Sequence, residues 1–210
     1  MRAKEELRIE NKRFFIVALI IDIIYSIMFL YYGIKCESTW NISVGSYLTV
    51  LSLINIMLFL FLIKNIKTRS KREENTVFHL TGVLLLISNI IFSYIVLRIV
   101  KYDEQFSYIN YIFYSLIVYI LYKTCYTILV IVKYRDINSS LLSSIKIVNI
   151  IELLLSIIAI QIAILFKIGG NNLLIRTTNI IVAETFTLVI YIIGIYMRLN
   201  RINKPSKHEK

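Results

Sequence analysis

The stretch FFIVALIIDIIYSIMFLYYGI, residues 14–34, decides the fold. Asp22 is the one charged residue in it. The hydrocarbon core of a bilayer is ~30 Å thick, and ~20 residues of helix cross it. The apolar run is too long for the core of a signal peptide, and no small-residue cleavage pattern follows it. It therefore predicts a transmembrane helix that is retained in the protein.

Five further apolar runs of similar length follow, at residues 44–63, 77–97, 108–132, 141–166 and 173–197. Apolar residues make up 58% of the chain, charged residues 18%, and the mean hydropathy is +0.72. Soluble domains are nearer ~45–50% apolar and ~25% charged. Because the connections are short, helices adjacent in sequence are expected to be antiparallel neighbours. The sequence predicts one all-α membrane domain over residues 1–210, an up-down bundle of about six helices.

The basic residues lie mostly on one side of these spans. Seventeen fall within 2–13, 64–72, 133–135 and 198–210, and five fall on the other side. The positive-inside rule then predicts that both termini are cytoplasmic. The net charge of +11 is explained by this topology and by attraction to anionic lipid of the inner leaflet, without nucleic acid.

Four ionisable side chains lie within the predicted spans near mid-bilayer. At 1.5 Å per residue their depths are roughly 13–20 Å from the predicted inner ends. Charged groups at this depth are costly, so each is a candidate for binding a substrate or ion. They come from four different helices and are Asp22, Lys123, Glu152 and Glu184.

Three acids against one lysine indicate an excess of carboxylate that would bind a proton, a cation or a cationic solute. Glu184 is the leading candidate, because it is the nearest of the four to the predicted outer side and lies beside two threonines, Thr185 and Thr187. The alternative is structural: Lys123 pairs with one acid to pin two helices, and the other acids are protonated and hydrogen-bonded.

Further polar side chains are candidates for lining a cavity around these charges. Tyrosines recur at three- and four-residue steps along the fourth span, which places them on one stripe of a helix. Amides lie in the second, third and fifth spans. These cavity-lining candidates are Tyr119, Tyr122, Tyr126, Asn55, Asn89 and Asn149.

Glycine is scarce, and no GxxxG pair occurs in any span. The sequence therefore predicts that close helix crossings at glycine are not the main packing mode.

No enzyme motif is present: the chain has no HExxH, no GxSxG and no P-loop. We expect no cofactor and no metal. We expect a small transporter or channel subunit with a midplane polar site. The alternative is a non-transporting membrane partner: a sensor, an immunity-type protein or the membrane subunit of a complex whose ATPase is another chain. An intramembrane enzyme stays a third possibility. Homo-oligomers or a partner subunit are compatible with this pattern, and the richness in Ile, Lys and Asn favours the plasma membrane of a bacterium.

Overall fold

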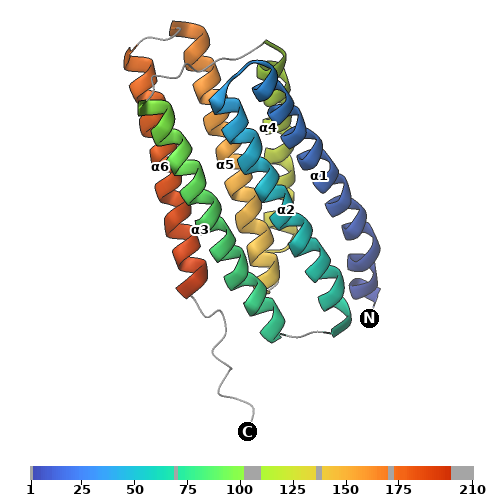
Figure 1. Cartoon of the computed structure of the whole chain (residues 1–210). Helices are drawn as coiled ribbons and strands as arrows, with labels where there is room; N and C mark the ends of the chain where they lie inside the picture. The colour runs from blue at the N-terminus through green and yellow to red at the C-terminus, as the bar shows by residue number, and fades with distance from the viewer. Residues whose placement is uncertain (1, 69–70, 102–109, 136–138, 170–172, 200–210) are drawn as a thin grey trace.

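The described residues of the computed structural model form six α-helices that lie side by side along a common long axis (Figure 1). The backbone is described for 2–68, 71–101, 110–135, 139–169 and 173–199, and side chains within these ranges for 13–64, 71–97, 111–135 except 112, 139–167 except 166, and 177–199. The helices are α1 (Arg2–Lys35), α2 (Thr39–Thr68), α3 (Lys71–Lys101), α4 (Asn110–Lys133), α5 (Ser140–Gly169) and α6 (Leu173–Leu199).

All six helices are long and apolar enough to cross a membrane, which confirms the predicted class of multi-pass membrane protein. Each predicted span lies within one helix, except that residues 108–109 of the fourth span lie outside the described residues. Serine hydroxyls mark two helix starts. Ser38 Oγ accepts a hydrogen bond from the Asn41 N–H before α2, and Ser139 Oγ accepts one from the Leu142 N–H before α5.

The helices pack as two layers of three. Neighbours within one layer are α1, α2 and α3, and within the other α4, α5 and α6. Across the layers, α1 faces α4, α2 faces α5, and α3 faces α6, with a further diagonal contact between α3 and α5. Helix α5 therefore touches four other helices. Half of its apolar membrane-length segment is buried, a larger share than in any other helix.

The outer surface of the bundle is apolar. Side chains such as Ile24, Val118 and Ile192 are more than half exposed. In a lipid bilayer such side chains contact acyl chains, so a membrane bundle can be apolar both in its core and on its surface.

The expectation about glycine is wrong at two helix pairs. A Cβ on Gly33 of α1 would lie 2.7 Å from the Ile42 backbone nitrogen, and one on Gly45 of α2 would lie 2.8 Å from that of Leu30. One glycine on each facing helix gives the same close approach that a GxxxG pair gives on one helix.

The same holds where α3 meets α6. A Cβ on Gly82 of α3 would lie 2.8 Å from the Met197 Cβ and 3.1 Å from the Gly194 carbonyl oxygen. Gly82 and Gly194 meet across this interface, and Gly33 and Gly45 lie on facing helices. A search within single spans therefore misses both crossings.

Candidate functional site: a buried ion cluster at mid-span

Polar side chains from four helices meet at one level of the bundle. We call the end of the bundle that carries Arg13, Lys64 and Lys133 the basic end. The polar side chains lie roughly 13–18 Å from this end, counted at 1.5 Å per residue along each helix from Arg13, Lys64, Lys133 and Ser140. The side chains are Asp22 of α1, Asn55 of α2, Lys123 of α4 and Glu152 of α5.

Lys123 lies between two carboxylates. Its Nζ is 2.8 Å from Asp22 Oδ2 and is also paired with Glu152 Oε2. The three side chains are 0–3% exposed, so bulk water and lipid headgroups do not reach these contacts. We refer to Asp22, Lys123 and Glu152 as the ion cluster.

Neutral donors complete the hydrogen bonding of both carboxylates. The Tyr119 hydroxyl donates to Asp22 Oδ1 at 2.9 Å, and Asn55 Nδ2 donates to Glu152 Oε1 at 2.9 Å. Each carboxylate oxygen of the cluster therefore has a partner, as the low local dielectric of a membrane interior demands. The cluster is closed and well bonded, which is the arrangement that lets buried charges persist.

Helical spacing explains how α4 supplies so many of these groups. Tyr119 precedes Lys123 by four residues and Tyr126 follows it by three, so all three share one face of α4. The Lys123 ammonium also lies over the Tyr126 ring, 5.3 Å from its centroid. On α5, Asn149 precedes Glu152 by three residues and shares its face.

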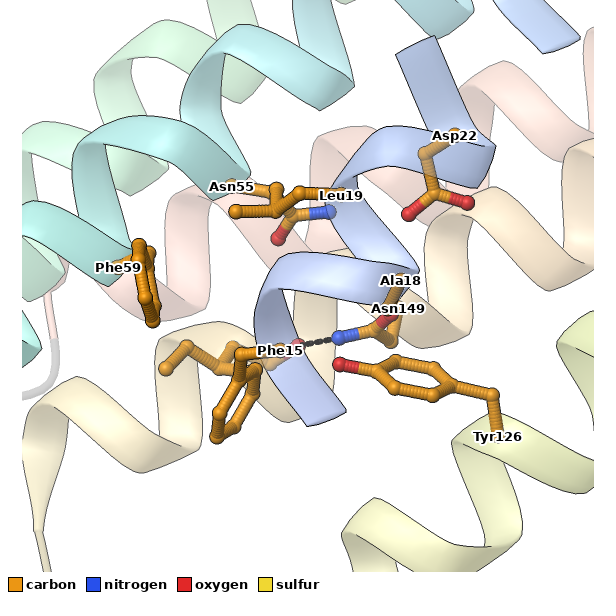
Figure 2. A pocket seen from close by; sticks show the side chains of 9 residues that line it. Phe15, Ala18, Leu19, Asp22, Asn55, Phe59, Tyr126 and Asn149 are labelled. Carbon is orange, nitrogen blue, oxygen red and sulfur yellow. Dashed lines mark hydrogen bonds between the residues drawn. The ribbon is translucent and has the colours of Figure 1, made fainter. Parts of the chain in front are cut away.

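A small cavity adjoins the cluster on the side of the basic end. Its volume is about 10 Å³, which is close to what one water needs. Figure 2 shows Asp22, Asn55, Asn149 and Tyr126 around it, and Phe15 and Phe59 at its apolar edge. Asp22 is the one charged residue of its lining. The other lining residues lie closer to the basic end than the cluster-level residue of the same helix, which is Asp22, Asn55, Lys123 or Glu152.

A row of aromatic rings separates α1 from α4. Phe14 stacks on Tyr126, with centroids 4.9 Å apart, and Tyr25 stacks on Tyr119 at 3.7 Å. Tyr122 lies between the two tyrosines of its own helix, at 6.2 and 6.0 Å. Tyr25 and Tyr119 are displaced from the cluster away from the basic end, so their stack covers the side opposite the cavity.

The structure brings together most of the predicted site residues. Asp22, Lys123 and Glu152 make the cluster, Asn55 and Tyr119 bond to it, and Tyr126 and Asn149 line the cavity with Asp22 and Asn55. Tyr122 is half-buried and contacts the neighbouring rings.

Two predicted residues lie elsewhere. Glu184 of α6 contacts Thr187 of its own helix, whose hydroxyl is 3.3 Å from Glu184 Oε2. Asn89 of α3 donates to the Thr187 carbonyl oxygen at 2.9 Å. Asn89 therefore belongs to the α3–α6 interface, whereas the contact of Glu184 lies within α6. Among the described residues, no contact joins either of them to the ion cluster.

Sequence reasoning missed Phe14 and Tyr25 as neighbours of the site. Tyr25 follows Asp22 by three residues, so it shares the face of α1 that carries the charge. That spacing is the signal that could have found it. Phe14 carries no such signal, since apolar aromatics are common throughout the spans.

The cluster carries an odd charge balance. Two ionised carboxylates and one ammonium leave a net charge of −1, which a bound proton or one monovalent cation would bring to zero. A net charge in the membrane interior is costly, so this imbalance favours the binding of a proton or a cation at the cluster. Comparison with known protein families, curated proteins and solved structures finds no match to this chain.

Proposed function

We propose that this chain is a small multi-spanning membrane transporter or channel subunit whose midplane site handles a proton, a cation or a cationic solute. The observation that carries the proposal is the sharing of one ammonium, Lys123, by two buried carboxylates, Asp22 and Glu152. Ionisable groups inside a membrane are otherwise selected against, because simpler apolar packing would hold helices together.

The position of the cluster in the bundle supports transport. Asp22 and Asn55 come from the layer α1–α3, whereas Lys123 and Glu152 come from the layer α4–α6. The contacts of Asp22 with Lys123 and Tyr119, and that of Asn55 with Glu152, therefore cross between the two three-helix groups. The Lys123–Glu152 pair lies within one group. Many transporters bind their substrate or coupling ion near the midplane, where two structural halves meet. Movement of one group against the other would break or remake these contacts.

Orientation completes the proposal. The helices cross the membrane up and down in turn, with both termini and the basic end on the cytoplasmic side of a bacterial plasma membrane. The cavity beside Asp22 then faces the cytoplasm, and the stacked Tyr25 and Tyr119 face the outside.

The proposal is tested with the purified chain in liposomes. Vesicles with a trapped pH indicator or a Na⁺ indicator are given an ion gradient or a membrane potential, and the flux is followed. We expect protein-dependent movement of protons or Na⁺ that is lost in Glu152→Gln. Glu184→Gln is the matched control, because it neutralises a carboxylate on α6 whose hydrogen bond is to Thr187 of the same helix. Wild-type flux no greater than that of empty vesicles would refute transport of these ions.

A second candidate is a membrane partner that transports nothing. One observation favours it: each carboxylate oxygen of the cluster already has a partner, so the cluster also suits a structural pin. In that case partners dock at the basic end, and neutralising the exposed Lys64 and Lys133 weakens co-purification of a partner subunit. The control variant neutralises Asp22, Lys123 and Glu152 together, and it should leave co-purification unchanged.

A further inference from the structure

We propose that the cavity beside the ion cluster is a binding site for one small monovalent cation of Na⁺ or Li⁺ size. The inference rests on the proposed function and deepens it by naming the ion class and the residues. The ligands are the carboxylate of Asp22, the amide oxygens of Asn149 and Asn55, and the hydroxyl oxygen of Tyr126, all of which line the cavity (Figure 2).

Each of the two amide nitrogens donates a hydrogen bond to an acceptor within the protein. Asn149 Nδ2 donates to the Ile145 carbonyl oxygen at 2.8 Å, and Asn55 Nδ2 donates to Glu152 Oε1 at 2.9 Å. Because one N–H of each amide is bound to an acceptor within the protein, the nitrogen is held in place and the carbonyl oxygen is the group left to accept or coordinate a ligand.

Asn149 gives the strongest single sign of a ligand. It is 2% exposed, and within the described part of the chain its Oδ1 has no hydrogen-bond donor. A buried acceptor without a donor is costly, so such groups mark places where something else binds. A cavity lined by acceptor oxygens and one carboxylate suits a cation, because hard cations prefer oxygen ligands.

The volume of the cavity and the net charge of the cluster narrow the class of cation that can bind. The cavity of about 10 Å³ admits one water-sized sphere, which excludes an organic cation. One monovalent cation would neutralise the net −1 of the cluster. A divalent cation would leave an excess positive charge beside Lys123, and Mg²⁺ and Ca²⁺ also need six or more oxygens or several retained waters.

The test measures binding directly, on the full chain in detergent. Thermal unfolding is followed by the fluorescence of Trp40, the single and buried tryptophan, in Na⁺, Li⁺, K⁺ or N-methylglucamine at equal ionic strength and pH. We expect Na⁺ or Li⁺ to raise Tm by about 5–10 °C once it is ~100-fold above its Kd. We expect N-methylglucamine to give no rise and K⁺ a smaller one.

Variants connect the shift to the site. Asn149→Leu removes the amide oxygen at similar volume and should abolish the Na⁺-dependent shift. Asn149→Asp keeps an oxygen ligand, adds a negative charge and should enlarge the shift, which keeps the test decisive if the leucine variant fails to fold. Asn89→Leu is the matched control, since it removes a buried amide at the α3–α6 interface and should keep the full shift.

Three outcomes would overturn the inference. Equal Tm values in all four salts would show that no small cation binds. A Tm that responds to pH alone would assign the charge imbalance to a proton and would leave the proposed transporter standing. A Na⁺ shift that stays at the wild-type size in both Asn149→Leu and Asn149→Asp would place the ion elsewhere. Conversely, Na⁺ binding without flux in liposomes would keep the site and refute transport.

Discussion

Replacing Lys123 by methionine should destabilise the protein far more than removing all three charges of the ion cluster together. The methionine keeps most of the side-chain volume, so the change is chiefly electrostatic. It leaves Asp22 and Glu152 as two buried carboxylates with no counter-ion. The neutral reference is the triple variant Asp22→Asn, Lys123→Met and Glu152→Gln.

The geometry gives the magnitude. At the 2.8 Å between Lys123 Nζ and Asp22 Oδ2, Coulomb attraction is roughly 6 kcal/mol at an effective dielectric constant of ~20. Burying each ion costs several kcal/mol, so the intact cluster contributes little net stability. Removing one partner leaves the burial cost uncompensated, and we expect a loss of ~3–5 kcal/mol. The triple variant should lose much less, because it buries no charge.

The assay is thermal unfolding in detergent, followed by Trp40 fluorescence. For a chain of this length, the expected loss corresponds to a fall in Tm of about 6–20 °C for Lys123→Met. Lys133→Met is the control: it removes an exposed lysine at the end of the same helix and should shift stability by no more than ~0.5 kcal/mol. If the triple variant melts as low as Lys123→Met, the ion cluster is not the electrostatic unit described here.

Three further predictions follow from the same geometry. An impermeant thiol reagent should label Cys36 in intact cells and spare Cys125, which lies within a span. If Cys36 is accessible in its loop but is labelled only after lysis, the proposed orientation is wrong. Tyr119→Phe should cost ~1.5–3 kcal/mol in unfolding, because its hydroxyl donates to a buried carboxylate, whereas Tyr122→Phe should cost little. Gly82→Ala should lower stability by ~1–3 kcal/mol, since its Cβ would meet backbone and Cβ atoms of α6; an unchanged Tm would contradict that close crossing.

The sequence by itself determined the class of protein and the depth of its polar groups. Span number and position follow from counting apolar residues, because a bilayer of fixed thickness demands a fixed length of helix. Depth follows from the constant rise per residue, which is why Asp22, Lys123 and Glu152 could be placed at one level before any contact was known.

Only the tertiary structure decided which of these groups meet. Glu152 and Glu184 have similar predicted depths, yet Glu152 lies on α5, which packs against four helices, and Glu184 lies on α6, which faces α3. The glycine crossings were hidden for the same reason, since each pairs residues of different helices. In a membrane, lipid-facing and core-facing side chains are both apolar, so hydropathy gives the depth of a residue but neither the rotation of its helix nor its neighbours. Those are set by the packing of all six helices together.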